Sequence, residues 1–469
     1  MPNEPQELLR KLPAVEALCK DPDVAKASEG VPRRIVVESA RAAVARMRKL
    51  ILERTCAGVD EEVIRRDTAS IAVALISEAA QPHYSHVINA TGIILHTGLG
   101  RAVLPARALE QIRGELAGYS LLQLETEGGK RSQRDERIEY LLKLLTGCEA
   151  ATVVNNNAAA TMLVLNALAK GREVIVSRGQ LVEIGGSFRL PDVMAASGAT
   201  LVEVGTTNKT HPKDYERAIT ENTAAILRVH PSNYKIIGFS EEVALDEMVR
   251  IAHAHKLPLI DDVGAGALVD FSRFGFAKEP TLPESVAAGA DLILSSADKL
   301  IGASQGGIIL GRADLVEKVR KNPIARMVRV GKLTLAALEA TLMLFLDEDL
   351  AMREVPTLRM LRRPLDEIDE QAARIAAALK AKRVRAMISV VDGFSQMGSG
   401  SLPGQNLPTK LVAIAPERMS PDDLAQHLRD SRPAVFARIQ KDTLLFDPRT
   451  ILDGEEPTLI DAVASALGN

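Results

Sequence analysis

The run 257-LPLIDDVGAG-266 is followed along the chain by 291-DLILSSADK-299 and 306-GGIILG-311, and these three stretches decide the fold. Each is short, rich in Leu, Ile and Val, and bounded by Gly, Asp or Pro, which is typical of a strand buried on both faces. Helical stretches separate this region from similar runs upstream, namely ATVVNNN (151–157), EVIVSRG (173–179), TLVEVG (200–205) and AAILRVHPS (224–232). The alternation predicts an α/β fold with a mostly parallel sheet covered by helices on both faces.

The pattern of the chain changes twice, which predicts three domains. Residues 1–80 are predicted to be helical, because residues 33–53 have apolar positions at helical spacing and contain no Gly or Pro. Residues 81–345 hold the alternating pattern of the large α/β domain. Residues 346–469 combine a long helical stretch, short strands and a final helix, and are predicted to form a small α+β domain.

The predicted N-terminal helix is strongly basic. Two acidic residues lie between residues 33 and 54, against seven basic ones: Arg33, Arg34, Arg41, Arg46, Arg48, Lys49 and Arg54. Such a run is usually the solvated face of a helix. The same charges also suit a surface that contacts a nucleic-acid phosphate backbone, so both interpretations stay open at this point.

The composition of the 469-residue chain excludes several classes of protein. Its 58 Lys and Arg nearly balance 61 Asp and Glu, for a formal net charge of −3, so a globally basic nucleic-acid binder is not indicated. Aromatic residues make up 3% and Trp is absent, which argues against a base-stacking surface. Cys19, Cys56 and Cys148 form no CxxC pair, so we expect neither a disulfide framework nor a metal site.

No stretch of the sequence predicts a membrane location. The N-terminal residues MPNEPQELLRKLPAVEALCK are interrupted by Pro and charge and lack an apolar signal core. The longest apolar stretch, residues 333–346, includes Glu339 and is too short to cross a bilayer, so it predicts a buried helix. We therefore expect a cytoplasmic protein with no membrane partner.

Polar residues follow the predicted strands at the points where parallel α/β sheets bind ligands. Residues 155–158 (NNNA) open a helix, where backbone N–H groups can bind an anion such as phosphate, although an Asn-rich helix cap explains them equally well. His230 and Ser232 follow another strand. The sequence contains neither GxxxxGK[ST] nor a strand–GxGxxG–helix element, so the nucleotide-binding fingerprints are absent.

Two further strand ends carry Asp261 and Asp262, then Asp298 and Lys299. Taken alone, such an Asp is usually a turn or cap, and such a Lys is usually a surface residue. Together with a phosphate seat they match the needs of pyridoxal phosphate, which requires an acid at its pyridine nitrogen and a Lys for its Schiff base. Burial of that Lys would lower its pKa, as attack on the cofactor aldehyde requires.

Three arginines form a second set of candidate residues. Arg101 follows LHTGLG, and Arg326 and Arg329 lie in NPIARMVRVGK. Because Arg326 and Arg329 are three residues apart, they would share one face of a helix. Paired guanidinium groups suit a tetrahedral oxyanion, although ordinary surface charge is the alternative interpretation.

Longer runs carry a family resemblance. The chain closely resembles bacterial selenocysteine synthase, the L-seryl-tRNA(Sec) selenium transferase family, over nearly its whole length. The resemblance rests on INATGIILHTGLGRA (88–102), VVNNNAAA (153–160), VSRGQLVEIGGSFRLPDVM (176–194), VGTTNKTH (204–211), VHPSNYKIIGFS (229–240), SADKLIG (296–302) and LTLAALEATL (333–342).

This resemblance implies a fold-type-I pyridoxal-phosphate enzyme and assigns its site. Lys299 would be the catalytic Schiff-base residue, and Asp262 rather than Asp261 would hold the cofactor ring, because the family places one Asp directly before its hydrophobic-Gly pair. The other cofactor-binding residues implied are Asn156, Asn157, Ala158, His230, Ser232 and Ser296. The residues implied for selenophosphate are Arg101, Arg326 and Arg329.

The resemblance also implies the reaction and the partners. The family converts seryl-tRNA(Sec) to selenocysteinyl-tRNA(Sec) by eliminating water from the β-carbon and adding selenium from selenophosphate to an aminoacrylyl intermediate. Its members have an N-terminal tRNA-binding domain, which would make the basic residues 33–54 a tRNA contact surface. They assemble into ring-shaped homodecamers whose active sites are shared between subunits.

Two other functions stay open from the sequence. A pyridoxal-phosphate lyase of the same superfamily would act on a small amino acid or amino sugar without tRNA, but such proteins typically lack the N-terminal helical extension. A non-catalytic relative would bind tRNA or a protein partner, but it would have no chemical use for Lys299 and Asp262.

Overall fold

The computed structural model describes residues 4–53, 60–186 and 188–468. The chain divides into two compact units, Met1–His86 and Val87–Asn469, and each is described by itself. Arg54 and Cys56, which belong to the basic run and the cysteine pattern of the sequence, lie outside the described residues.

The first unit is helical. Its helices are α1 (Glu4–Arg10), α2 (Val15–Cys19), α3 (Pro22–Ala27), α4 (Arg33–Leu52) and α5 (Glu61–Ala79). In α4 the buried residues Val36, Ala40, Ala43, Met47 and Ile51 recur every three or four positions, so they form one apolar face. This face packs on Ala69, Ala72 and Ile76 of α5 and on Leu18 of α2. The sequence prediction of a helical N-terminal region is confirmed.

The opposite side of α4 is charged. Its six described basic residues, Arg33, Arg34, Arg41, Arg46, Arg48 and Lys49, are all exposed. Glu38 pairs with Arg41 and Glu53 with Lys49. Within the described part of the chain, the other four basic residues have no ion-pair partner.

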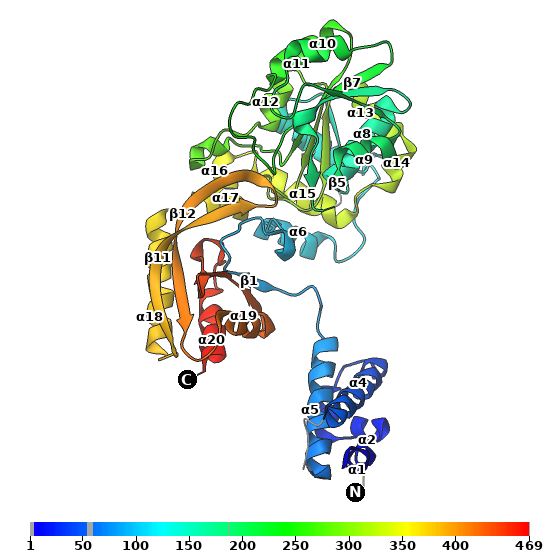
Figure 1. Cartoon of the computed structure of the whole chain (residues 1–469). Helices are drawn as coiled ribbons and strands as arrows, with labels where there is room; N and C mark the ends of the chain where they lie inside the picture. The colour runs from blue at the N-terminus through cyan, green and yellow to red at the C-terminus, as the bar shows by residue number, and fades with distance from the viewer. Residues whose placement is uncertain (1–3, 54–59, 187, 469) are drawn as a thin grey trace. The chain divides into compact units, whose positions relative to one another are not determined.

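The second unit contains a seven-stranded sheet whose strand order is β2-β10-β9-β8-β7-β3-β6. Figure 1 shows this part of the second unit, with helices around the sheet. The strands are β2 (Ala150–Val154), β3 (Glu173–Ser177), β6 (Thr200–Val204), β7 (Thr223–Val229), β8 (Leu259–Gly264), β9 (Leu292–Ser296) and β10 (Gly307–Gly311). The ladders from β6 through β9 are parallel, and β10 runs antiparallel to both β2 and β9. The predicted α/β fold with a mostly parallel sheet is thereby confirmed.

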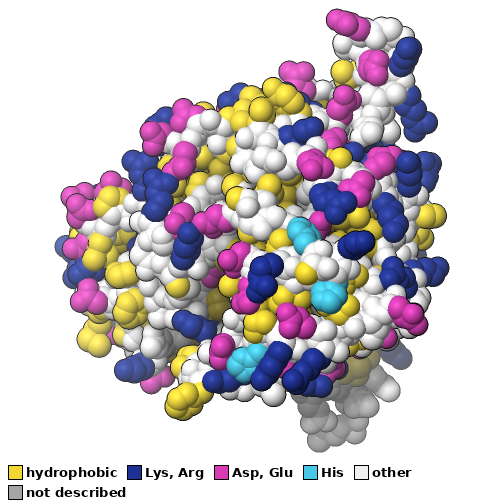
Figure 2. Space-filling model, turned by 90° about the horizontal axis from the view of Figure 1, so that it is seen from above, with side chains coloured by type: hydrophobic (Ala, Val, Ile, Leu, Met, Phe, Trp, Pro, Cys, Tyr) yellow, Lys and Arg dark blue, Asp and Glu magenta, His cyan; other side chains and the backbone are white. Residues whose placement is uncertain are grey.

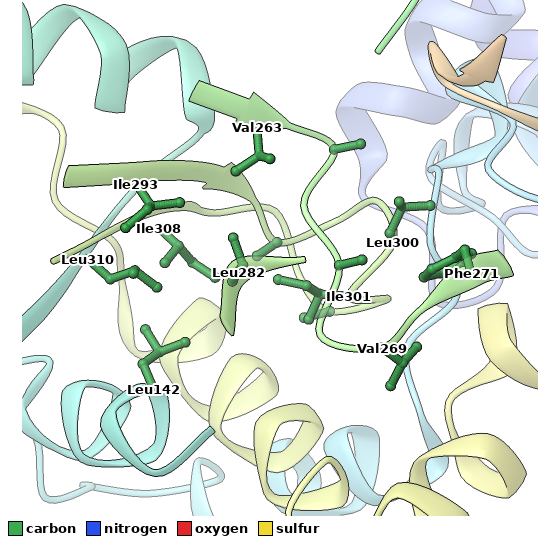
Figure 3. Close-up of a cluster of buried hydrophobic side chains, with 14 of the residues drawn as sticks. Leu142, Val263, Val269, Phe271, Leu282, Ile293, Leu300, Ile301, Ile308 and Leu310 are labelled. Carbon is green, nitrogen blue, oxygen red and sulfur yellow. The ribbon is translucent and has the colours of Figure 1, made fainter. Parts of the chain in front are cut away.

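Helices cover both faces of this sheet. One face packs on α8 (Asn157–Ala169), α9 (Leu190–Ser197) and α13 (Ala313–Lys321). The other packs on α7 (Glu136–Thr146), α11 (Leu245–Ala254), α12 (Leu282–Ala287) and α15 (Lys332–Leu344). Figure 3 shows part of this second layer, in which Leu142 of α7 faces Ile293, Ile308 and Leu310 of the sheet. The buried helix predicted from residues 333–346 is α15, so that prediction is confirmed.

A second, antiparallel sheet follows near the C-terminus. Its strand order is β11-β12-β15-β14, and α18 (Leu365–Ala381) and α20 (Glu456–Leu467) share a core with it. The strands are β11 (Ala386–Gly398), β12 (Ser401–Pro416), β14 (Arg438–Gln440) and β15 (Thr443–Phe446). Beside it, β1 (Val87–Asn89) pairs in parallel with β13 (Ala434–Phe436), so the start of the second unit is joined to its C-terminal part. The predicted small α+β region is confirmed, while the predicted boundary at residue 345 stays a prediction.

Charges of both signs are interspersed on the face of the molecule shown in Figure 2, as the balanced composition leads one to expect. No helix among the described residues is long and apolar enough to cross a membrane.

Candidate active site

The carboxyl ends of β7, β8 and β9 lie side by side and carry three of the predicted residues. Val229 is the partner of Asp262 across the β7–β8 ladder, and Asp262 is the partner of Leu294 across the β8–β9 ladder. His230 directly follows β7, and Lys299 lies three residues beyond β9. The sheet topology therefore gathers residues that are up to 69 positions apart in the sequence (299 − 230).

Asp262 is buried and surrounded by hydrogen-bond donors. Its Oδ1 accepts from Asn157 Nδ2 at 2.9 Å and from the Gly264 N–H at 3.1 Å, and its Oδ2 accepts from Thr161 Oγ1 at 2.8 Å. Burial raises the pKa of this carboxyl group above its usual range, and the three donors partly oppose that effect. Asp262 is thus a buried carboxyl group whose protonation state depends on the hydrogen-bond donors and charges next to it.

Asp261 has a different environment. Its Oδ1 accepts from Arg228 Nη1 at 2.7 Å and its Oδ2 from Ser285 Oγ at 2.7 Å, within a fully buried setting. Successive side chains of a strand point to opposite faces, so Asp261 faces away from α8 while Asp262 faces toward it. Both oxygens of Asp261 are occupied, which supports Asp262 as the acid for a ligand.

Lys299 is buried in the turn that follows β9. Burial lowers the pKa of its amine, the nearby charge of Arg101 lowers it further, and Asp298 and Asp262 oppose these effects. The next two residues, Leu300 and Ile301, are fully buried in the apolar layer of Figure 3. Burial thus holds the amine at a fixed place and shifts its protonation equilibrium toward the neutral, nucleophilic form.

Arg101 lies beside this lysine rather than with the other two predicted arginines. Its Nη1 forms an ion pair of 2.8 Å with Asp298 Oδ2, and its backbone adopts a left-handed φ of 63°, which a non-glycine residue rarely does. Ser296, predicted to bind the cofactor, instead donates to Asp298 Oδ1 at 3.0 Å. Asp298 therefore ties Arg101 and Ser296 together next to Lys299.

The predicted phosphate seat is the N-terminus of α8. Asn156 caps this helix, with its Oδ1 accepting from the Ala159 N–H at 2.8 Å, and Asn157 and Ala158 form the first turn. The seat lies close against β10, since a Cβ on Gly307 would come within 2.1 Å of the Asn156 carbonyl oxygen. The Asn run therefore caps the helix and also leaves backbone N–H groups at the helix N-terminus, where an anion can bind.

His230 and Ser232 lie at the same edge of the sheet, but the imidazole has a protein partner. The His230 N–H donates to the Asp262 carbonyl at 2.9 Å, while His230 Nε2 lies 2.7 Å from Glu279 Oε2. Ser232 is buried, and its Oγ would lie 3.2 Å from a Cβ on Gly264. Sequence reasoning missed Glu279, because a single Glu in a loop carries no recognisable pattern.

Arg326 and Arg329 are both exposed. The helix α14 (Pro323–Met327) ends before Arg329, which instead forms a bridge to Val154, so the expectation that one helix face presents both residues is wrong. They nevertheless line one cavity of about 230 Å³. Among the described residues that line it, neither Lys299 nor Asp262 occurs.

The residues around Asp262 and Lys299 fit pyridoxal phosphate. A buried carboxyl group suits a ring nitrogen, a buried amine suits an aldehyde, and a helix N-terminus suits a phosphate. Asn157 Oδ1 is buried without a partner in the described structure, so the site holds an unsatisfied polar atom beside the acid. In the described ranges no group of three or more His, Cys, Asp or Glu side chains could hold a metal ion.

Comparison with known proteins gives two family matches. A model described as L-seryl-tRNA selenium transferase matches residues 87–452, and one described as selenocysteine synthase N terminal matches residues 9–48. An L-seryl-tRNA(Sec) selenium transferase of Alkaliphilus metalliredigens (strain QYMF) is 46% identical over 97% of this chain and 98% of its own length. One from Nitratidesulfovibrio vulgaris is 48% identical over 84% of each chain.

A solved structure shares the fold. D-glucosaminate-6-phosphate ammonia-lyase aligns with a TM-score of 0.55 over 81% of this chain and 95% of that chain, at 21% sequence identity. At that identity the likeness concerns the fold alone.

Proposed function

The chain belongs to the L-seryl-tRNA selenium transferase family, and we propose that it converts seryl-tRNA(Sec) to selenocysteinyl-tRNA(Sec) with selenophosphate as the selenium donor. The observation that carries this proposal is that the family matches cover both units of the chain, at residues 9–48 and 87–452. A lyase of the same fold would account for the second unit but not for the first. The 46% and 48% identities to selenium transferases weigh further against it.

Pyridoxal phosphate is the cofactor, and different site residues would bind its ring, its aldehyde carbon and its phosphate. Asp262 would hold the ring nitrogen protonated, Lys299 would hold the aldehyde carbon, and Asn156, Asn157 and Ala158 would bind the phosphate at the start of α8. His230, Ser232 and Ser296 would lie around the ring. When bound, the cofactor withdraws electrons from the seryl α-carbon, so that the β-hydroxyl group can leave as water.

Lys299 has the properties of the base in this reaction. Burial lowers the pKa of its amine, which favours the neutral form that can take the seryl α-proton at Nζ. Arg101, which is paired with Asp298, lowers the pKa of this amine further, whereas Asp298 and Asp262 raise it.

The selenium donor is an anion, and the predicted arginines provide its binding energy. We place selenophosphate on Arg101, Arg326 and Arg329, whose guanidinium groups can hold a tetrahedral oxyanion through paired N–H donors. Because Arg326 and Arg329 line a cavity without Lys299, we propose that active sites are completed between copies of the chain in a ring-shaped homodecamer. The exposed apolar side chains of Tyr119 and Leu121 support a surface that a second copy covers.

The first unit would deliver the tRNA. Arg33, Arg34, Arg46 and Arg48 of α4, which have no ion-pair partner among the described residues, suit a phosphate backbone. The chain has no Trp and few other aromatic residues, which favours recognition of tRNA shape over splayed bases. We therefore propose that residues 1–80 bind tRNA, residues 81–345 bind the cofactor and residues 346–469 form the small domain. The reaction is proposed to take place in the cytoplasm.

The proposed function is tested by incubating the purified holoenzyme with seryl-tRNA(Sec) and selenophosphate, then identifying the amino acid on the tRNA by mass spectrometry. Selenocysteine is the expected product, and free selenophosphate should be consumed with it. Serine left unchanged on the tRNA, with ammonia released from free amino acids or amino sugars, would replace the proposal by a lyase.

A further inference from the structure

The cavity that Arg326 and Arg329 line holds more positive charge than these two residues supply. It lies beside β2, the edge strand of the large sheet, and measures about 230 Å³. Its lining includes one carboxylate, that of Asp135, and five arginines: Arg131, Arg134, Arg320, Arg326 and Arg329. Neither Arg131 nor Arg134 belongs to the set that the sequence assigned to a substrate.

The protein neutralises only part of this charge. Arg320 forms an ion pair of 2.8 Å with Glu139. Asp135 Oδ2 accepts from the Thr152 hydroxyl and the Val153 N–H of the edge strand β2. For Arg131, Arg326 and Arg329, the described part of the chain offers no carboxylate within ion-pair distance. Three guanidinium groups thus line the cavity with no acidic partner in the described ranges.

Arg134 is held in place by neutral groups. Its Nη1 donates to the Val330 carbonyl at 2.9 Å and its Nη2 to Gln123 Oε1 at 3.0 Å. Burial lowers its pKa, and the charges of Arg329, Arg131 and Arg326 lower it further, with Asp135 opposing them. A guanidinium fixed by carbonyl oxygens among like charges is arranged to meet an anion.

We propose that Arg131 and Arg134 join Arg326 and Arg329 in one pocket that binds a compact tetrahedral oxyanion of two negative charges. The volume lies below the roughly 300 Å³ at which pockets for larger organic ligands begin, so a phosphate-sized group suits it better than a nucleotide. Where the anion is selenophosphate, the inference rests on the proposed function. Arg131 and Arg134 are then further substrate-binding residues of the same reaction.

The test uses the cofactor-loaded enzyme, so that the phosphate seat at α8 is already filled, and titrates inorganic phosphate by calorimetry. Arg131→Gln and Arg134→Gln are each expected to weaken phosphate binding by about tenfold or more, because each removes a charge-assisted hydrogen bond. Arg113→Gln is the matched control, since Arg113 is exposed on α6 (Ala106–Glu115) and does not line the cavity. It should leave phosphate affinity unchanged.

A second variant separates binding from folding at Arg134, whose two hydrogen bonds also hold Val330 and Gln123 in place. Arg134→Lys keeps the charge, so it should retain part of the phosphate affinity, and the melting temperature and visible absorbance of the bound cofactor report on the fold. Unchanged phosphate affinity in both Gln variants would overturn the proposal. So would a loss of tRNA affinity alone, which would make the pocket a tRNA-backbone contact. Wild-type enzyme that binds phosphate but forms no selenocysteine would refute the proposed function and leave the pocket intact.

Discussion

Thr161 offers the sharpest test of how the site controls its buried acid. Its hydroxyl group donates to Asp262 Oδ2 at 2.8 Å, and the side chain is fully buried. Thr161→Val keeps the shape of the side chain but removes this donor from a carboxylate. A hydrogen bond to a charged group contributes about 1.5–3 kcal/mol, so the ionised form of Asp262 should lose about that much stabilisation.

Removing the Thr161 hydroxyl should weaken the binding of the cofactor. Thr161 lowers the pKa of Asp262, so its removal lets burial raise that pKa further. Because a protonated ring nitrogen requires an ionised Asp262, pyridoxal phosphate should bind about 10- to 100-fold more weakly. The gap should widen as the pH falls toward the raised pKa of Asp262, where less of the variant's carboxyl group is ionised.

The assay is a titration of cofactor-free enzyme with pyridoxal phosphate, followed by visible absorbance across a pH series. Thr161→Ser is the control, because it restores the hydroxyl group and should bind nearly as wild type does. If Thr161→Val binds pyridoxal phosphate as tightly as wild type at every pH, Asp262 is not the acid that meets the ring.

Further predictions concern other residues of the site and the N-terminal unit. Lys299→Ala should abolish turnover and the absorbance of the covalently held cofactor; normal turnover would remove Lys299 from the mechanism. Arg101→Gln removes a charge that lowers the pKa of Lys299, so the pH–rate profile should shift to higher pH, and an unshifted profile would argue against this coupling. Gly307→Ala should weaken pyridoxal phosphate binding more than tenfold, because its Cβ would collide with the Asn156 carbonyl 2.1 Å away; this is measured by the same titration. Replacing Arg46 and Arg48 by Gln should weaken tRNA binding and make it less sensitive to salt, with the slope of log affinity against log salt falling by about one for each phosphate that the variant no longer neutralises. Unchanged binding by this double variant would move the tRNA surface elsewhere.

Much of the large domain could be predicted from the sequence because its strands are buried on both faces. Continuous apolar runs such as LPLI and LILSS mark such strands without ambiguity, and polar residues directly after them lie at one edge of the sheet. That reasoning placed Asp262 and Lys299 together correctly. It could not predict that β10 is antiparallel, because the apolar pattern of a buried strand does not indicate whether the strand runs parallel or antiparallel to its neighbours.

The contacts between side chains were harder to predict. Thr161 could have been found, because it lies one helical turn after Asn157 and so shares its face toward Asp262. Glu279 could not, because its partner His230 lies 49 residues away and only the tertiary fold joins them. The short α14 ends before Arg329, so a spacing of three residues gave the wrong local geometry although both arginines reach the same cavity.

The cavity that the arginines line could not be predicted from the composition of the chain. A net charge of −3 gives no sign of local positive charge, yet five arginines from three separate segments line one cavity. Two of them, Arg131 and Arg134, come from a stretch whose sequence carries both signs of charge. Only the packing of that stretch against β2 and the segment after α14 brings them together.

Radioactive selenium can show whether Lys299 drives selenium transfer to tRNA. Purified enzyme is given seryl-tRNA(Sec) and selenophosphate labelled with radioactive selenium, and the label attached to tRNA is counted for wild type and for Lys299→Ala. We expect the label to appear on tRNA as selenocysteine with wild type and to be absent with the variant. Unlabelled seryl-tRNA(Sec) after incubation with cofactor-loaded wild type would show that the enzyme does not transfer selenium to tRNA, and equal labelling by the variant would show that Lys299 is not required.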